Sequence, residues 1–296
     1  VYSARTQVDV EAILEGVDGL HTVLYPANTM KNFQALRYYH LNHFFINHGD
    51  SDKAVNQSKL LMAYDKLLVG GPLAERRLNM AGLPLRPSQV EYVGRPQAEI
   101  MLSRIEQPEP IRRILYAPTW EGFVEGVNYS SVRPFGLELL EALRDDGRFE
   151  VMLKPHPYIG VRDRTTATYR KRMERLCDGQ RLTLVGGHAS IHDSMNQSDL
   201  LITDISSVLN EYLATRKPIA VCNVLGREEG DLHAEFPSTA AGYTLDSGAT
   251  IRELMNRLEQ SDELWEQREA IRRDALGDFP EGAVARFQSV ISESVQ

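Results

Sequence analysis

Short apolar segments that alternate with longer amphipathic stretches are the feature that most limits what this chain can fold into. Each segment has four or five residues, is rich in Val, Ile, Leu, Tyr or Phe, and is bounded by Gly, Pro, Asn or Asp, as strands usually are. Their apolar residues run continuously instead of alternating, which is typical of strands buried on both faces. The nine predicted strands span residues 22–25, 43–47, 66–70, 90–94, 113–117, 150–154, 182–186, 200–203 and 219–223.

Helical patterns lie between these strands, as at residues 135–145 and 208–217, and the chain from about residue 250 onward also reads as helical. This alternation predicts an α/β fold in which helices cover parallel sheets. A segment with two prolines and two glutamates at residues 104–111 predicts a linker between two domains. Only about four strands precede this linker, which is few for a doubly wound domain, so we expect the first domain to be truncated.

Composition excludes several classes of protein. Among 296 residues, 33 Lys and Arg stand against 41 Asp and Glu, and the formal net charge of -8 argues against a non-specific nucleic-acid binder. Cys177 and Cys222 are far apart and form no C-x-x-C pair, so neither a disulfide scaffold nor a cysteine zinc site is expected. No apolar run approaches the roughly 18 residues that cross a bilayer. We expect a cytoplasmic protein, and a membrane-associated segment before Val1 would place it at the inner face of the cell membrane.

Polar residues follow the predicted strands directly, where open parallel sheets bind their ligands. The first such residue is His48, which is followed by Gly49 and is suited to move protons near neutral pH. The alternative is a turn with a hydrogen-bonded histidine. The nearby Asp50 and Asp52 resemble carboxylates that hold a divalent ion, but such a pair is common by chance in a loop, and we expect no metal.

Two proline-containing segments follow later strands. In Tyr-Ala-Pro-Thr-Trp at residues 116–120, Thr119 offers a hydroxyl and a backbone N–H to an anion. In Lys-Pro-His-Pro at residues 154–157, the prolines hold a cation and an imidazole in rigid relation, which suits a developing phosphate charge. The alternatives are a plain turn for the first segment, with Trp120 packed on the core, and a stiff surface turn for the second.

The segment Thr-Asp-Ile-Ser-Ser at residues 203–207 joins a strand to a helix, an arrangement that cradles anions at the free N–H groups of the helix. Asp204 or Ser206 could instead only cap the helix. Glu211, one turn further along, either reaches a ribose hydroxyl or is a solvated helix residue. His188 and His192 lack a third ligand nearby, so we expect no metal there.

A basic amphipathic stretch at residues 162–175 is usually a solvated helix face, but it could contact an anionic membrane. The chain has no phosphate-binding G-x-x-x-x-G-K-[ST] loop, no H-E-x-x-H helix, no G-x-S-x-G elbow and no Rossmann glycine fingerprint. P-loop NTPases, zincins and serine hydrolases are therefore not expected.

Taken in order, His48-Gly49 and the segments at residues 116–120, 154–157 and 198–221 resemble the CDP-glycerol glycerophosphotransferase family, bacterial enzymes of teichoic-acid and related polymer synthesis. The resemblance covers about residues 40–225. It implies two Rossmann-like domains in a glycosyltransferase-B-like architecture, with the active site in the interdomain cleft. No cofactor is implied, and the donor would be CDP-glycerol or a similar CDP-activated polyol.

The implied domains are an N-terminal, acceptor-side domain over residues 1–105 and a donor-binding domain over residues 110–260. Helices over residues 261–296 are expected to pack back on the first domain. The resemblance implies catalytic roles for His48 and His156. Residues expected to bind the donor are Lys154, Pro118, Thr119, Asp204, Ser206, Ser207 and Glu211.

Two departures from the family pattern give further candidates. The family commonly has Thr-Pro after His-Gly, where this chain has Asp-Ser-Asp. The family also commonly has Gly-Tyr-Pro-Arg-Asn-Asp, where this chain has Gly-Arg-Pro-Gln-Ala-Glu at residues 94–99. Acceptor or phosphate contacts are accordingly expected from Asp50, Ser51, Asp52, Lys53 and Arg95.

The resemblance implies that a polyol phosphate passes from the CDP-activated donor to a hydroxyl of a polyol-phosphate or lipid-linked acceptor, with release of CMP. No nucleic-acid partner is expected, and the protein could contact an anionic membrane peripherally. Two alternatives remain open. One is a glycosyltransferase that uses a nucleotide-sugar, and the other is a non-catalytic nucleotide-binding module of a larger polymerase.

Overall fold

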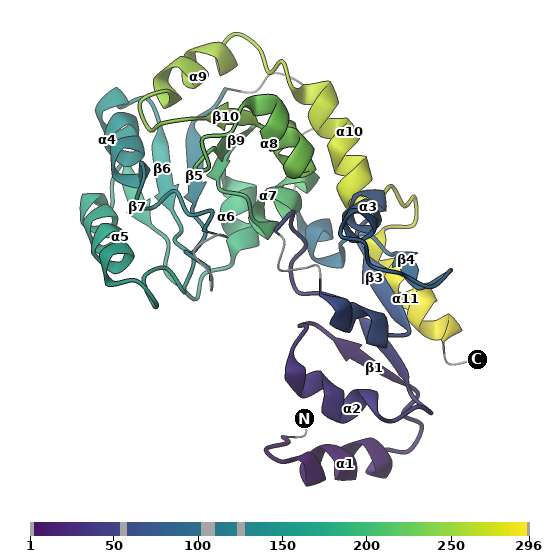
Figure 1. Ribbon diagram of the computed structural model, residues 1–296. Helices are drawn as coiled ribbons and strands as arrows, with labels where there is room; N and C mark the ends of the chain where they lie inside the picture. Colours follow the sequence, from purple (N-terminus) through teal and green to yellow (C-terminus); the bar gives the residue numbers. More distant parts are fainter. Residues whose placement is uncertain (1–2, 54–57, 102–109, 123–127, 295–296) are drawn as a thin grey trace. The chain divides into compact units, whose positions relative to one another are not determined.

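The computed structural model describes residues 3–53, 58–101, 110–122 and 128–294, and the chain divides into two compact units (Figure 1). The first unit comprises Val1–Asp50, Val55–Glu99 and Ala275–Gln296, and the second comprises Ser51–Ala54 and Ile100–Asp274. The short segment Ser51–Ala54 thus belongs to the second unit although the first unit surrounds it in the sequence. Most of the linker predicted at residues 104–111 lies outside the described residues.

A parallel four-stranded sheet in the order β1-β2-β3-β4 forms the first unit. Its strands are β1 (Thr22–Tyr25), β2 (Asn42–Phe45), β3 (Lys66–Val69) and β4 (Val90–Tyr92). The helical elements of this unit are α1 (Gln7–Gly16), η1 (Met30–Asn32), α2 (Phe33–Leu36), η3 (Lys59–Ala63), α3 (Pro72–Met80), η4 (Pro96–Ile100, whose last residue belongs to the second unit) and α11 (Ala283–Glu293).

Both faces of this sheet are covered, as the continuous apolar runs predicted. Phe44 and Phe45 are neighbours in β2, and because successive side chains of a strand point to opposite faces, they enter different clusters. Phe45 packs with Tyr64 and other residues on one face. Phe44 packs on the other face with Val290 of α11, so the C-terminal helix helps to bury the first sheet.

The second unit is built on a parallel six-stranded sheet in the order β10-β9-β8-β5-β6-β7. Its strands are β5 (Arg113–Ala117), β6 (Glu150–Leu153), β7 (Leu182–Leu184), β8 (Leu200–Thr203), β9 (Ile219–Cys222) and β10 (Tyr243–Leu245). The helical elements are α4 (Gly136–Asp146), α5 (Arg164–Leu176), α6 (Ile191–Gln197), α7 (Ser207–Tyr212), η6 (Leu213–Thr215), α8 (Glu229–Glu235), η7 (Pro237–Ala241), α9 (Ile251–Leu258) and α10 (Trp265–Leu276, whose last two residues belong to the first unit).

The order of these strands creates a switch point between β5 and β8. From β5 the chain runs outward through β6 and β7, and it then returns to add β8, β9 and β10 on the other side. Ala117 and Thr203, the last residues of β5 and β8, are paired in register. Pro118 and Asp204 therefore start the two loops at the edge where ligands of doubly wound sheets bind.

The α/β class and the parallel sheets are confirmed, and all nine predicted strands are present. The tenth strand, β10, was missed because its three residues are followed directly by Asp246, whereas the equally short β4 and β7 are followed by a valine. The helix predicted at residues 208–217 is shorter, since α7 passes into η6 and Arg216 adopts a positive φ of 59°. Pro218 disfavours helical geometry at the residue before it, which explains the early end. In the described part of the chain, none of the helices combines the length and hydropathy needed to cross a membrane.

Candidate active site

Asp204 joins the two loops that start at the switch point. Its carboxylate accepts hydrogen bonds from the backbone N–H groups of Thr119, at 2.7 Å, and Ser131, at 3.2 Å. The side chain is fully buried, and burial raises its pKa to about 6 although these hydrogen bonds act in the opposite direction. The carboxylate thus shapes the loop after β5, and the donor contact expected of Asp204 stays a prediction.

Thr119 is held in this loop by three hydrogen bonds. Its backbone N–H is directed to Asp204 and is not available to an anion. Its hydroxyl accepts a hydrogen bond of 2.9 Å from Nζ of Lys53, which comes from the Ser51–Ala54 segment of the same unit. Ser130 donates from its hydroxyl to the Thr119 carbonyl at 2.7 Å, so this loop is held at several atoms.

The two carboxylates that resembled a metal pair are used separately. Asp50 forms an ion pair with Arg77 in the first unit. Asp52, in the second unit, accepts hydrogen bonds from the N–H and the hydroxyl of Ser238, at 2.7 and 3.1 Å. Asp52 and Ser51 are both buried, and the acceptor or phosphate contacts expected of them stay predictions. Among the described residues, no group of three or more His, Cys, Asp or Glu could hold a metal ion.

The Lys-Pro-His-Pro segment lies against the loop after β5. The N–H of His156 donates to the Pro118 carbonyl at 3.3 Å, which joins the two motifs that the sequence analysis singled out. The His156 ring stacks on Trp120, with 6.1 Å between centroids and an angle of 16°. Nζ of Lys154 donates to the Gly186 carbonyl at 3.0 Å, and burial lowers the pKa of this lysine.

The backbone determines which nitrogen of His156 carries the proton. Nδ1 accepts a hydrogen bond of 3.1 Å from the N–H of Tyr158, so the neutral ring must carry its hydrogen on Nε2. Burial and the positive charge of Lys53 lower the pKa of His156 to about 4, with Glu121 acting in the opposite direction. At neutral pH this histidine is therefore an uncharged hydrogen-bond donor.

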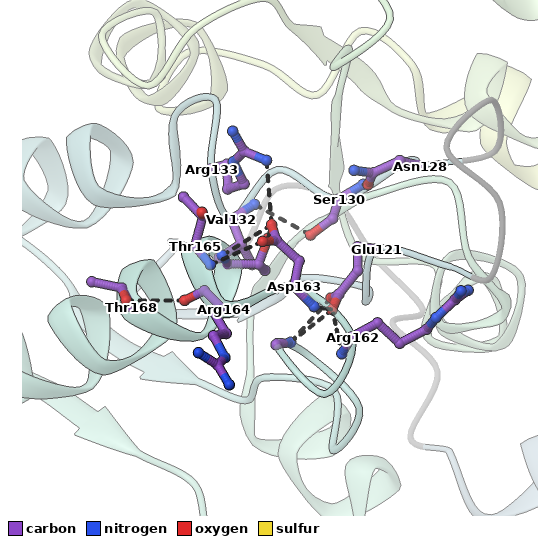
Figure 2. Close-up of polar contacts among 12 residues, drawn as sticks. Glu121, Asn128, Ser130, Val132, Arg133, Arg162, Asp163, Arg164, Thr165 and Thr168 are labelled. Atoms are coloured by element: carbon purple, nitrogen blue, oxygen red, sulfur yellow. Dashed lines mark hydrogen bonds and ion pairs between the residues drawn. The ribbon is translucent and has the colours of Figure 1, made fainter.

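Glu121 braces the loop that follows His156, and it is not among the site residues predicted from the sequence. Its buried carboxylate accepts from the N–H groups of Gly160 at 3.0 Å, and of Arg162 and Asp163 at 3.3 Å (Figure 2). Asp163 in turn caps α5. The available signal was an acidic residue directly after the Tyr-Ala-Pro-Thr-Trp segment.

A cavity of about 350 Å³ lies beside Ser130, in the size range of small-molecule sites. Arg133 supplies its positive charge and forms an ion pair of 3.3 Å with Asp163 (Figure 2). None of the residues expected to bind the donor lines this cavity. Its walls are Asn128, Ser130, Arg133, Pro134, Thr166, Tyr169 and Val224.

The start of α7 carries the two predicted serines, both partly exposed. Ser206 is the N-cap residue but makes no side-chain hydrogen bond to the helix, and its hydroxyl lies 3.4 Å from that of Thr203. Glu211 lies further along α7, and its Oε2 is 3.0 Å from Nε2 of His192 in α6. Glu211 is thus not a solvated helix residue, because its carboxylate accepts a hydrogen bond from the imidazole N–H of His192.

In the first unit, His48 is held in the opposite tautomer to His156. Its Nδ1 lies 2.8 Å from the Pro26 carbonyl, which can only accept, so the neutral ring carries its hydrogen on Nδ1 and has a lone pair on Nε2. Arg95 donates to the carbonyls of Asn47, at 3.3 Å, and His48, at 2.6 Å. The phosphate contact expected of Arg95 stays a prediction, and in the structure its buried guanidinium braces the His48 loop.

Comparisons with known proteins agree with this architecture. The family described as CDP-Glycerol:Poly(glycerophosphate) glycerophosphotransferase matches residues 92–284, which include His156 and the loops at the switch point but not His48. The chain is similar to the solved structure of the wall teichoic acid polymerase TagF, with a TM-score of 0.59 and 15% identity over 93% of this chain and 72% of that chain. No curated protein sequence matches the chain.

Two further structures are similar in fold. One is a putative UDP-N-acetylglucosamine 2-epimerase from Listeria monocytogenes, with a TM-score of 0.63 and 15% identity over 97% of this chain and 78% of that chain. The other is a glycosyltransferase from Rickettsia africae, with a TM-score of 0.53 and 13% identity over 99% and 83%. These identities show the fold alone, whereas the family match spans more than half of the sequence. The chain belongs to the CDP-glycerol:poly(glycerophosphate) glycerophosphotransferase family.

Proposed function

We propose that this protein transfers glycerol phosphate, or a similar polyol phosphate, from a CDP-activated donor to a hydroxyl of a polyol-phosphate or lipid-linked acceptor and releases CMP. The product would extend or prime a teichoic-acid-like polymer of the cell envelope. One observation carries the proposal: the two motif histidines are held in opposite tautomers, His48 with a free lone pair on Nε2 and His156 with a hydrogen on Nε2. Family membership supports the donor and the reaction type.

His48 acts as the general base in this scheme. The acceptor oxygen forms a bond to the β-phosphorus of the donor, and the bond from that phosphorus to the bridging oxygen breaks. CMP leaves with the electron pair, and the hydroxyl proton passes to Nε2 of His48. Well-placed base catalysis contributes a factor of about 10²–10⁴ to the rate.

The donor is bound by the second unit. The Nε2 hydrogen of His156 is donated to an oxygen of the diphosphate, and Lys154 contributes positive charge nearby. The hydroxyls of Ser206 and Ser207 are further donors, and Glu211 accepts from the ribose. Phosphoryl transfer depends on positioning and charge stabilisation, so we propose that no cofactor or metal takes part.

The remaining motif residues act indirectly. Thr119 and Pro118 lie in the loop that Asp204 shapes, and the Pro118 carbonyl accepts the N–H of His156. They position the donor-binding groups instead of supplying charge themselves.

The proposal is tested by mixing the protein with CDP-glycerol and a glycerol-phosphate primer, with and without a lipid anchor, and by measuring CMP. We expect CMP release that depends on the primer, together with transfer of labelled glycerol to it. Binding of CDP-glycerol without any CMP release, with either primer, would contradict the transferase reaction and favour a non-catalytic nucleotide-binding module.

A nucleotide-sugar glycosyltransferase is the second candidate. It is favoured by the fold similarity to a glycosyltransferase. Thermal-shift measurements with CDP-glycerol, CDP-ribitol, UDP-sugars and GDP-sugars separate the two, because a ligand specific for the folded state raises its melting temperature. We expect stabilisation by the CDP-polyols, whereas stabilisation by the sugar nucleotides alone would favour the second candidate.

A further inference from the structure

Lys53 places an ammonium group at the switch point of the second sheet. Its Nζ donates to the Thr119 hydroxyl at 2.9 Å and lies 5.8 Å from the centre of the Tyr129 ring. Thr119 is the second residue after β5, at the edge where doubly wound sheets bind ligands. The lysine therefore reaches the same corner as the donor-binding loops, although it lies far from them in the sequence.

The position of Lys53 is held by its neighbour. The buried carboxylate of Asp52 accepts from both the N–H and the hydroxyl of Ser238, which lies 186 residues away in the chain. Two hydrogen bonds to a carboxylate with this geometry fasten the segment to the second unit. The hydrogen bonds of Asp52 therefore fix the backbone next to Lys53.

The surroundings of Lys53 favour an anion. The charged groups that influence it are Asp204, whose carboxylate is already used by two backbone N–H groups, and His156, whose pKa its charge lowers. Its hydroxyl and ring partners are both neutral, and within the described ranges it forms no ion pair with a carboxylate. An ammonium that is partly removed from water and lacks a carboxylate partner gains most from a bound anion.

We propose that Lys53 binds the diphosphate of the donor, so that its ammonium and the Nε2 hydrogen of His156 contact one ligand. This inference rests on the proposed function and adds a residue that lies outside the segment matched by the family, residues 92–284. Lys53 would be a binding residue supplied by the segment that follows His48, while Asp52 would position it.

Calorimetry with matched variants and ligands tests the assignment. We expect Lys53→Met to weaken CDP-glycerol binding by about 10- to 100-fold, the effect of losing a charge-assisted hydrogen bond, and to leave cytidine binding within about twofold. Lys53→Arg should keep most of the affinity for CDP-glycerol. The control is Lys59→Met, which removes an exposed lysine of η3 in the first unit and should change neither ligand.

The pH dependence gives a readout that a purely structural role would not move. Burial lowers the pKa of Lys53 to about 8, so the free site loses its positive charge as the pH rises through 8. Affinity of the wild-type protein for CDP-glycerol should fall between pH 7 and 9.5, whereas Lys53→Arg should fall clearly less because guanidinium remains protonated. Lys154, whose pKa burial also lowers, is common to both proteins, so the difference between the two profiles reports on Lys53. Asp204 and His156, with pKa values of about 6 and 4, do not titrate in this range.

The outcomes are distinguishable. If the wild-type protein binds neither CDP-glycerol nor CMP, the proposed function itself fails. If it binds CDP-glycerol and Lys53→Met binds equally well, only the role of Lys53 is overturned. Equal losses for cytidine and CDP-glycerol would also overturn it, because they would indicate a structural effect. If circular dichroism shows that Lys53→Met does not fold, the pH dependence of CDP-glycerol affinity in Lys53→Arg decides. An affinity that falls with pH as steeply as in the wild-type protein would reject the inference.

Discussion

The His48 loop of the first unit and the His156 loop of the second are built alike and end in opposite chemistry. Each histidine comes three residues after the last residue of a parallel strand, β2 or β6. Each loop is braced by one buried charged side chain. Arg95 donates to two carbonyls around His48, whereas Glu121 accepts from three N–H groups after His156.

The difference between the loops lies in the partner of Nδ1. A carbonyl at Pro26 fixes a hydrogen on Nδ1 of His48, and an N–H at Tyr158 removes it from Nδ1 of His156. In the neutral rings, Nε2 is therefore a hydrogen-bond acceptor in one loop and a hydrogen-bond donor in the other. The backbone environment of an imidazole, and not its presence in a motif, decides its role.

Removal of the base should have the largest effect. We expect His48→Ala to lower kcat by about 10²–10⁴ and to leave the Kd for CDP-glycerol within about twofold, since His48 makes no ground-state contact with the donor in the proposed scheme. His48→Gln should be equally inactive, because its amide supplies no proton-accepting nitrogen. Primer-dependent CMP release and calorimetry measure the two quantities. Activity near that of wild type in either variant would refute the base assignment.

Removal of the hydrogen-bond donor at His156 should have a smaller effect on kcat than removal of the base, and it should also change the Kd for CDP-glycerol. His156→Ala should weaken CDP-glycerol binding by about 10-fold and lower kcat, the cost of one hydrogen bond to a charged group. His156→Gln should recover part of both, since its amide N–H can replace the Nε2 hydrogen. The contrast with His48→Gln separates the two tautomers. Unchanged affinity in His156→Ala would show that this ring does not contact the donor.

Substitution of each bracing residue should affect the same constant as substitution of the histidine in the loop that it holds. Arg95→Met frees the carbonyls around His48 and should lower kcat by about 3- to 10-fold with little change in Kd. Glu121→Gln loosens the loop after His156 and should raise the Kd for CDP-glycerol by a similar factor. Each variant should also lose about 1–3 kcal/mol of unfolding free energy in urea. If both variants changed mainly kcat, or both mainly Kd, the proposal that the two loops have different roles would be wrong.

The smallest effect concerns stability against acid. The folded pKa of His156, about 4, lies below the value of about 6.5 expected in the unfolded chain, so the unfolded state binds more protons between these values. Stability should therefore fall as the pH decreases from 6.5 to 4. His156→Phe keeps a ring beside Trp120. Its melting temperature, measured by scanning calorimetry, should depend less on pH over this range than that of the wild-type protein. Parallel curves for the two proteins would argue against a depressed pKa.

Much of the site could be predicted because it depends on strand ends. The continuous apolar runs located nine strands, and the polar residues after β5, β6 and β8 were singled out for their position. Parallel pairing then brings the ends of β5 and β8 to one edge. The short β10, which no further apolar residue follows, and the buried Glu121 were missed, since each leaves too weak a local signal.

Local sequence thus determined the α/β class, the strands and the order of the motif loops, because hydrophobic periodicity and strand termination are properties of neighbouring residues. Tertiary structure alone decided what the polar groups do. It directed Asp204 to backbone N–H groups, turned Arg95 onto carbonyls and placed Lys53 beside Thr119. Those roles depend on partners that lie tens of residues away in the chain, and a buried polar group takes whichever partner the fold brings within hydrogen-bond distance.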